Sequence, residues 1–390
     1  MDSRIVFITQ HADPAHPLLA ATVPKIAALA ERSEEVVVLA NGAERSALPE
    51  NAPIRLFNAS SKLGRGLRFE RALAAEFAKR KRPAAVIAHM CPIYAVLAAP
   101  LARTLGVPVL LWYTHWSAGR TLRAAERLSD AVISVDRRSF PIESAKVNPI
   151  GHGVDVDAFR CLEPRPRDGA LRVLVLGRYS PAKGVEAILE SVRLATRRGV
   201  DVELEIRGPT MTRFEEEHRA RLEKTVAELG LVDRVRFADA VAWRELPEVF
   251  AANDVLVNNM RPGAPDKVVY EAAASCLPVI ASNPAFETLL DERFRFSTDD
   301  VTALADRLVD FAGLDEGARC NVGREVRRGV VAHHSVAHWA DRVLAVVRAA
   351  NGSPTYADAT PDERRALARS TISTAAAAAA SASRKANGGR

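Results

Sequence analysis

Short runs of β-branched and apolar residues alternate with longer helical patterns along most of this chain. In the first half the runs occupy residues 5–9, 35–39, 54–57, 84–88, 107–112 and 131–135. In the second half they occupy residues 172–176, 202–206, 235–237, 254–257 and 278–281. The segments between the runs, such as residues 92–105, are long and apolar enough to be crossover helices. Strands that alternate with helices in this way predict parallel, doubly wound sheets, and therefore an α/β fold.

A proline-rich, charged stretch, LEPRPRDG at residues 162–169, separates the two series. The chain of 390 residues is long enough for two domains, since a domain usually has roughly 100–200 residues. We therefore expect two Rossmann-like domains, at residues 1–160 and 170–335. A helix over residues 336–350 is expected to cross back onto the first domain, and the alanine-rich, low-complexity segment 352–390 to be a disordered tail.

The four cysteines, Cys91, Cys161, Cys276 and Cys320, form no CxxC pair and no Cys/His cluster. This spacing suggests neither a zinc site nor a disulfide framework, so we expect free thiols in a reducing cytosol. No secretion signal is recognised, and no apolar run approaches the roughly 20 residues that span a bilayer. We therefore expect a cytoplasmic protein.

The segment from residue 62 to residue 82 is strongly basic. Between Ala59 and Arg82 there are eight Lys or Arg residues against only Glu70 and Glu76. One interpretation is a solvated helix face whose apolar groups face the core. The other is peripheral contact with an anionic membrane, such as the inner face of the plasma membrane, or attraction to a phosphorylated acceptor. No nucleic-acid-binding module accompanies the charge, so nucleic acid is not an expected partner.

A phosphate-binding turn is predicted after the strand at residues 172–176. The sequence GRYSPAKG at residues 177–184 combines an N-cap (Ser180), a proline suited to the first helical position, and two cations, Arg178 and Lys183. A helix N-terminus offers unpaired N–H groups and a partial positive charge. The segment can therefore hold a diphosphate, although both cations could equally be surface residues.

A second candidate site follows the strand at residues 254–257. A Pro/Gly loop leads there to a helix that starts near Asp266, a plausible N-cap, with Glu271 about one turn inside it. A carboxylate in this position can accept hydrogen bonds from a ribose diol. A solvated or capping Glu is the alternative reading.

These segments resemble glycosyltransferase family 4. The resemblance rests on residues 177–184, on residues 254–257 and on VVYEAAASCLPVIA at residues 268–281, which occur in the family's order and at similar spacings. Shorter matches are IGHGVD at residues 150–155 and RVRF at residues 234–237. The resemblance implies a GT-B fold and a retaining transferase that moves a sugar from a nucleotide-diphosphate donor to an acceptor hydroxyl, with a lipid-linked molecule as one candidate acceptor.

The resemblance also implies roles for individual residues. Arg178 and Lys183 would contact the diphosphate, Glu271 the ribose, and His115 would lie beneath the donor sugar. The loop and helix start that include Gly263, Ala264, Lys267 and Val268 would complete the donor site. Gly263 departs from the family pattern, in which a second Glu often stands eight positions before the ribose-binding one. This departure keeps open a catalytically silent sugar-nucleotide-binding or scaffold subunit, and a nucleotide-sugar epimerase is a further alternative.

We expect neither a cofactor nor an essential metal. No Asp-x-Asp signature ends a strand, and Asp299 and Asp300 are expected to cap a helix. The cations and helix N-termini can instead stabilise the charge that develops on the departing diphosphate. No pair of carboxylates typical of a glycosidase and no GxGxxG typical of a dehydrogenase can be placed.

Overall fold

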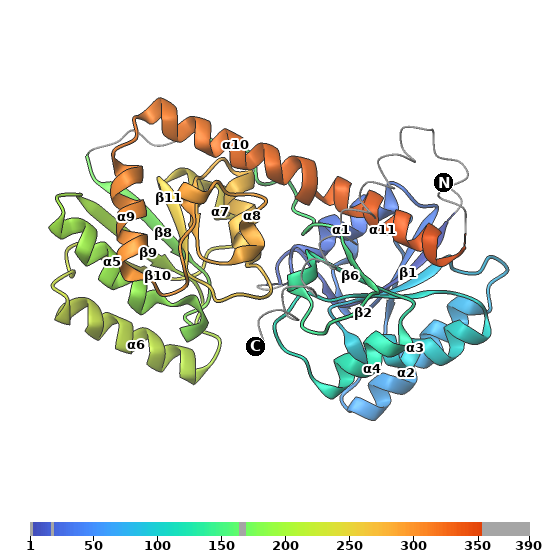
Figure 1. The fold of residues 1–390 in the computed structure, drawn as a ribbon. Coiled ribbons are helices and arrows are strands. Elements are labelled where there is room, and N and C mark those ends of the chain that lie inside the picture. The colour runs from blue at the N-terminus through green and yellow to red at the C-terminus, as the bar shows by residue number, and fades with distance from the viewer. Residues whose placement is uncertain (1–2, 17–18, 164–168, 353–390) are drawn as a thin grey trace, which may run out of the picture.

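The computed structural model describes residues 3–16, 19–163 and 169–352, which form two α/β domains connected by a linker and by the last two helices (Figure 1). Part of the predicted linker and the predicted tail from residue 353 onward lie outside the described residues. The predicted GT-B architecture, with two facing Rossmann-like domains, is confirmed.

The N-terminal domain contains a seven-stranded parallel sheet with the order β3-β2-β1-β4-β5-β6-β7. Its strands are β1 (Arg4–Ala12), β2 (Glu35–Ala43), β3 (Ile54–Leu56), β4 (Ala85–His89), β5 (Val109–Trp112), β6 (Ala131–Ser134) and β7 (Val147–Pro149). Its helices are α1 (Thr22–Ala30), α2 (Lys62–Phe77), α3 (Pro92–Thr104) and α4 (Arg120–Leu128). The pattern analysis placed the first six strands but did not predict the short β7.

The C-terminal domain contains a five-stranded parallel sheet with the order β10-β9-β8-β11-β12. Its strands are β8 (Leu171–Leu176), β9 (Val202–Arg207), β10 (Val235–Ala238), β11 (Val255–Asn258) and β12 (Val279–Ala281). Its helices are α5 (Val185–Arg197), α6 (Arg213–Glu228), α7 (Leu246–Ala251), α8 (Lys267–Ala274), α9 (Val301–Ala312) and α10 (Glu316–His334), and α11 (Val336–Ala350) follows.

Helices cover both faces of each sheet. Because successive side chains of a strand point to opposite faces, both sets of side chains are buried. In β1, Ile5 and Phe7 pack with α1 and α11, whereas Val6 and Ile8 pack with α2, α3 and α4. In the C-terminal domain the β8 side chains divide in the same way between α5, α6 and α9 on one face and α7, α8 and α10 on the other. This two-sided burial explains why the strands are continuous apolar runs.

Helix α11 crosses from the C-terminal domain to the N-terminal domain, as expected (Figure 1). Its Trp339 is fully buried and lies edge-on to Trp112 at the end of β5, with 5.6 Å between the ring centroids. Asp341 of α11 pairs with Arg32, which follows α1, at 2.7 Å. A single apolar cluster therefore continues from one domain into the other.

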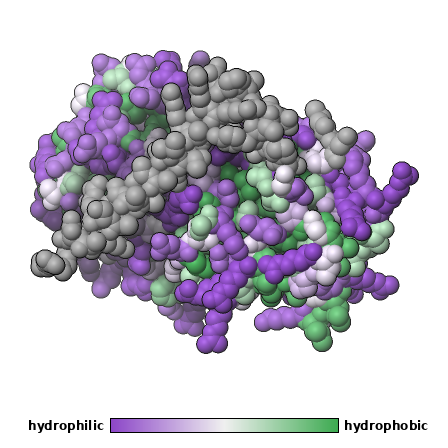
Figure 2. Space-filling model, turned by 45° about the vertical axis from the view of Figure 1, so that its right-hand side comes forward, coloured by the Kyte–Doolittle hydropathy of each residue, from purple (hydrophilic) through white to green (hydrophobic). Residues whose placement is uncertain are grey.

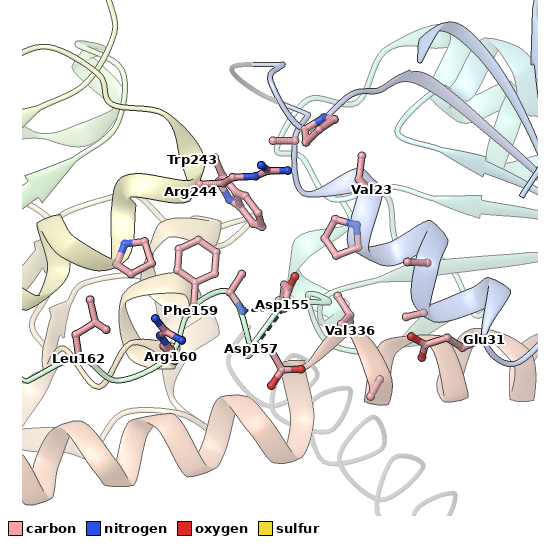
Figure 3. A pocket seen from close by; sticks show the side chains of 18 of the residues that line it. Val23, Glu31, Asp155, Asp157, Phe159, Arg160, Leu162, Trp243, Arg244 and Val336 are labelled. Atoms are coloured by element: carbon pink, nitrogen blue, oxygen red, sulfur yellow. Dashed lines mark hydrogen bonds between the residues drawn. The ribbon is translucent and has the colours of Figure 1, made fainter. Parts of the chain in front are cut away.

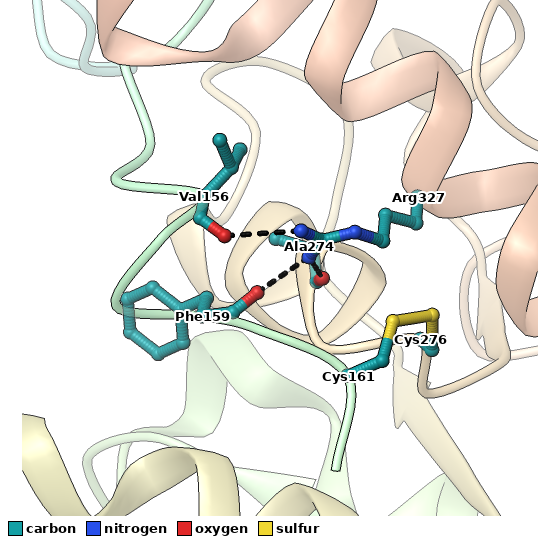
Figure 4. The surroundings of a disulfide bond; sticks show 6 residues. All are labelled: Val156, Phe159, Cys161, Ala274, Cys276 and Arg327. Atoms are coloured by element: carbon teal, nitrogen blue, oxygen red, sulfur yellow. Dashed lines mark hydrogen bonds between the residues drawn. A yellow bond between two sulfur atoms is a disulfide. The ribbon is translucent and has the colours of Figure 1, made fainter.

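The expectation of four free thiols is wrong. Cys161, in the segment after Phe159, is disulfide-bonded to Cys276, which follows α8, with 5.2 Å between their Cα atoms and a sequence separation of 115 (Figure 4). The pairing depends on the linker folding back over the C-terminal domain, which spacing in the sequence does not reveal. Cys91 and Cys320 remain free. The cysteines therefore give no support for a reducing compartment.

The guanidinium of Arg327 fixes the same linker. It donates hydrogen bonds to the backbone oxygens of Phe159 (2.7 Å) and Val156 (3.1 Å) and also to that of Ala274 (Figure 4). One α10 side chain thus joins the linker to the end of α8. The disulfide and these charge-assisted hydrogen bonds together attach the linker to the C-terminal domain.

Candidate functional site

The two sheets present their carboxyl ends at topological switch points, where loops leave in opposite directions and ligands bind in α/β folds. In the C-terminal domain the switch point lies between β8 and β11. The predicted GRYSPAKG turn follows β8, and the Pro/Gly loop follows β11. Because β8 and β11 are neighbours in the sheet, both candidate segments lie at the same end of it, next to each other.

The turn after β8 is built as predicted, with an added 3-10 segment. Ser180 caps the short helix η3 (Pro181–Lys183) by accepting a hydrogen bond from the Ala182 N–H, and α5 begins only after Gly184. The backbone of this turn packs tightly on the end of β9. A Cβ atom at Gly208 would lie 1.9 Å from the carbonyl oxygen of Gly177, so this position requires glycine.

Lys183 joins the two halves of the crevice. Its ammonium group lies over Gly177, donates a hydrogen bond to the Leu176 carbonyl (3.2 Å) and forms an ion pair with Asp266. Asn258 also donates a hydrogen bond to Asp266, at 2.9 Å. Asp266 occupies the N-cap position of α8, but its side chain makes no capping bond. Its predicted role as a cap is therefore wrong, because the carboxylate is engaged by Lys183 and Asn258 instead.

Arg178 is the second residue of the turn that follows β8. Its side chain is 50% exposed and pairs at 3.1 Å with Glu215, a buried residue in the first turn of α6. Partial burial, and secondarily the positive charge of Arg178, lower the pKa of His115 below its usual value. Arg178 and His115 come from different domains, and the two side chains are close enough for their charges to interact.

The His115 loop meets the loop that precedes α8. The His115 imidazole stacks on the indole of Trp116, with 5.0 Å between ring centroids. A Cβ atom at Gly263 would lie 3.5 Å from the Cβ of Trp116. Trp116 therefore borders the space that a longer side chain at position 263 would enter. Gly263 has a φ of 130°, which only glycine adopts readily. Asn283 holds this loop by donating hydrogen bonds to the carbonyls of Arg261 and Gly263.

Glu271 is buried in α8, with 2% of its surface exposed. Its Oε1 accepts a hydrogen bond from the indole N–H of Trp243 (2.9 Å) and lies 3.5 Å from Nζ of Lys267. Its Oε2 is buried and has no hydrogen-bond partner. The carboxylate therefore keeps one oxygen available to a donor group that enters the crevice.

The remaining predicted contacts differ in what they can offer. Lys267 stands at the start of α8 with 31% of its side chain exposed. Val268 is buried in the apolar cluster, so only its backbone can face a ligand. Ala264 is half-buried in the loop beside Gly263.

Trp243, Trp116 and Glu215 contact the predicted site residues but carry no prediction from the sequence, and Asp266 was predicted only as a helix cap. Trp243 also borders a cavity of about 730 Å³ between the domains. Figure 3 shows Trp243, Arg244 and Phe159 on one side of it, Val23 and Glu31 from the α1 region on the other, and Asp155 and Asp157 between them.

No group of three or more His, Cys, Asp or Glu side chains among the described residues is placed to hold a metal ion. No helix in the same part of the chain combines the length and apolarity that a membrane span requires. Asp300 caps α9, as expected, whereas Asp299 bonds to Asn259 instead.

Part of the chain is similar in sequence to known glycosyltransferases. Residues 170–313 match the sequence model of the family described as "Glycosyl transferases group 1". A D-inositol 3-phosphate glycosyltransferase of Streptomyces avermitilis is 27% identical over 59% of this chain and 51% of its own length. An MMP alpha-(1->4)-mannosyltransferase of Mycolicibacterium hassiacum is 30% identical over 47% of this chain and 44% of its own. The chain thus spans about half the length of these relatives.

Solved structures share the fold at low sequence identity. Anabaena HepE, crystallised with UDP and glucose, superposes with a TM-score of 0.70 at 15% identity, over 89% of this chain and 100% of its own. Sucrose-phosphate synthase from Thermosynechococcus elongatus gives a TM-score of 0.67 at 20% identity, over 89% of this chain and 98% of its own.

Proposed function

Residues 170–313 carry the domain of the glycosyl transferases group 1 within a chain of GT-B fold, and from this premise we propose that the protein is a retaining glycosyltransferase. It would move a sugar from a nucleotide-diphosphate donor to an acceptor hydroxyl. The bond between the anomeric carbon and the diphosphate oxygen breaks with its electron pair going to the diphosphate. The acceptor oxygen bonds to that carbon, and the hydroxyl proton passes to the departing nucleotide.

The diphosphate would bind between the turn after β8 and the N-terminus of α8. Arg178 is half exposed and can turn from Glu215 to a phosphate. Lys183 is paired with Asp266, so a diphosphate would have to share or replace that carboxylate. Both cations, with the α8 N-terminus, would stabilise the negative charge that grows as the bond breaks, as preorganised groups do in a site with restricted water. We propose that this charge stabilisation needs no divalent ion.

The nucleoside would lie toward Trp243. The Oε2 atom of Glu271 would accept a hydrogen bond from a ribose hydroxyl, which would satisfy a buried oxygen that otherwise has no partner. Because Trp243 and Lys267 enclose the carboxylate, one of these side chains would have to move when the nucleotide enters. His115, on the stacked pair with Trp116, would lie beneath the sugar and next to Gly263.

The observation that carries this proposal is the ion pair between Lys183, in the turn after β8, and Asp266 at the start of α8, the helix that carries Glu271. The test is acceptor-dependent release of nucleotide from a panel of UDP-, GDP- and ADP-sugars, repeated with EDTA. We expect one donor class to turn over and EDTA to leave the rate unchanged. Sugar conversion without acceptor would indicate an epimerase, and donor binding without turnover over a broad acceptor panel would indicate a silent subunit.

We also propose that α2 brings the protein to an anionic membrane, with its N-terminal half as the contact. Leu73 and Phe77 are buried, but Leu63 and Leu67 are 75% and 64% exposed, and Leu56 in neighbouring β3 is 59% exposed. Apolar and charged side chains lie side by side on the lower surface of the N-terminal domain in Figure 2. Shallow insertion of leucines beside basic groups is typical of peripheral attachment.

The basic run at residues 79–82 is less free than the sequence suggested. Lys79 pairs with buried Glu76 at 2.6 Å, and Lys81 pairs with Glu34. The decisive variant is therefore Leu63→Ser with Leu67→Ser. Vesicle co-sedimentation should require anionic lipid, weaken with salt and be lost in this variant, while recovery that is equal with neutral and anionic vesicles at low salt would reject the contact.

A further inference from the structure

A second cavity, of about 570 Å³, opens at the carboxyl end of the N-terminal sheet. Its floor is formed by Gln10 and His11 at the end of β1 and by Met90 just after β4. Strands β1 and β4 are neighbours at which the connections reverse direction, so this cavity lies at the switch point of the N-terminal domain. It is separate from the donor crevice between β8 and β11.

The lining of this cavity is polar, and its ionisable groups are basic or weakly acidic. Arg65 of α2 and His11 contribute positive or protonatable groups, and Gln10, Asn41 and Asn58 contribute amides. Among the described residues that line it, there is no Asp or Glu. A concave site with a guanidinium and no carboxylate favours an anionic ligand.

Several groups in the cavity are prepared for hydrogen bonding but incompletely used. Nε of Arg65 and Oδ1 of Asn41 are buried atoms without a hydrogen-bond partner. The hydroxyl of Tyr94 interacts with both side chains, so they are held close together. Buried polar atoms without partners are uncommon in native proteins and are explained when a ligand supplies the missing bond.

The N-terminus of α3 opens onto the same cavity. Cys91 occupies the N-cap position without a side-chain capping bond, and Cys91, Pro92 and Ile93 line the cavity. The 13-residue helix therefore directs the positive end of its dipole at the cavity. This partial charge adds to the full charge of Arg65. The residue before the cap, Met90, has a φ of 57°, a strained conformation that turns the chain sharply into the helix.

The cavity adjoins the reaction centre of the proposed transferase. The sulfur of Met90 accepts a hydrogen bond from the Thr114 N–H at 3.4 Å, and Thr114 precedes His115. An acceptor anchored in the cavity would thus reach toward the sugar that lies over His115.

We propose that this cavity binds a phosphate group of the acceptor, with Arg65 as the main anchor, so that the acceptor is a phosphorylated polyol or sugar or the headgroup of a phospholipid. This inference rests on the proposed glycosyl transfer. A free hydroxyl of the same molecule becomes the nucleophile. The phosphate takes no part in bond making and sets only position, which makes Arg65 a specificity-determining residue.

The first test needs no turnover. Thermal shift and calorimetry would compare matched pairs of free alcohol and phosphate ester: inositol with D-inositol 3-phosphate, glucose with glucose 6-phosphate, and glycerol with glycerol 3-phosphate, with inorganic phosphate as a further probe. We expect at least one ester to bind tenfold or more tightly than its alcohol and inorganic phosphate to compete with it. Arg65→Ala should weaken ester binding about 10- to 100-fold and leave alcohol binding unchanged.

Arg71→Ala is the matched control, because it removes the same charge from an exposed position of the same helix. Arg65→Lys keeps the charge without the planar fork and should fall between wild type and Arg65→Ala. Equal binding of esters and alcohols, equal losses in Arg65→Ala and Arg71→Ala, or absence of binding by every ester and by inorganic phosphate would each overturn the proposal.

A second arm identifies the source of the phosphate. Transfer to soluble esters indicates a sugar or polyol phosphate, whereas transfer only to phosphatidylinositol vesicles, and not to phosphatidylcholine vesicles, indicates a lipid headgroup. Nucleotide calorimetry is run in parallel. Binding of an ester without binding of any nucleotide would contradict the proposed glycosyl transfer but support the anion site. Turnover of a nucleotide sugar with unphosphorylated acceptors alone would support glycosyl transfer but reject the anion site.

Discussion

Replacement of Arg178 by alanine tests the donor site most directly. The guanidinium is half exposed and forms an ion pair with Glu215. Glu215 also accepts a hydrogen bond from the Met211 N–H at 2.7 Å, so it retains a partner in the variant. We therefore expect the fold to lose no more than about 1 kcal/mol, as for other partly exposed ion pairs.

The expected loss of nucleotide affinity follows from the exposure. A charge-assisted hydrogen bond contributes roughly 1.5–3 kcal/mol, and the lower figure suits a half-exposed cation that solvent screens. A loss of about 1.5 kcal/mol raises the dissociation constant of the nucleoside diphosphate about tenfold. Calorimetry with UDP and GDP measures this directly.

The same variant should change His115. Burial lowers the pKa of His115, and the charge of Arg178 lowers it further, so removal of the charge should raise that pKa toward its usual value. Titration of the imidazole by NMR gives the shift. Arg213→Ala is the control, because Arg213 is 90% exposed in α6 and pairs only locally with Glu217.

A dissociation constant within twofold of wild type, together with an unchanged His115 titration, would refute the placement of Arg178 between the diphosphate and the N-terminal domain. A change in nucleotide affinity without a change in the pKa of His115 would support the contact between Arg178 and the phosphate and reject only the proximity of Arg178 and His115.

Three further predictions follow from other parts of the structure. Glu271→Gln should weaken nucleotide binding about tenfold through a lost charged acceptor, and calorimetry should show a smaller deficit for a 2′-deoxynucleotide; equal ribose discrimination in variant and wild type would contradict the contact. The Cys161→Ser, Cys276→Ser variant should lose up to about 4–5 kcal/mol in denaturant unfolding, since a 115-residue closure is released, whereas Cys320→Ser should not. Burial lowers the pKa of Lys25 from 10.5 to about 7, so between these pH values the unfolded state binds more protons than the folded state, and the free energy of unfolding should rise with pH. Lys25→Met should flatten this pH dependence and be more stable than wild type near pH 7. An unaltered pH dependence in the variant would contradict the prediction.

The sequence determined the fold class and the position of the donor segments, because both depend on local periodicity. Eleven apolar runs predicted eleven of the strands, since strands covered on both faces are continuous apolar stretches. The GRYSPAKG turn and the loop before α8 follow strands, and parallel strands deliver such loops to one edge. Arg178, Lys183 and Glu271 could therefore be assigned to one end of the C-terminal sheet from the sequence alone, and residues 170–313 match the family described as glycosyl transferases group 1.

The tertiary structure alone decided which side chains pair. Asp266 was expected to cap α8, but Lys183, 83 residues earlier, takes its carboxylate. Trp243 reaches Glu271, and Cys161 reaches Cys276, across a chain that has folded back on itself. The N-terminal cavity likewise gathers Gln10 of β1, Asn41 of β2, Arg65 of α2 and Met90 after β4. Such contacts join residues far apart in sequence, and no periodic pattern records them, because each is fixed by the packing of whole elements and not by the chain's local preferences.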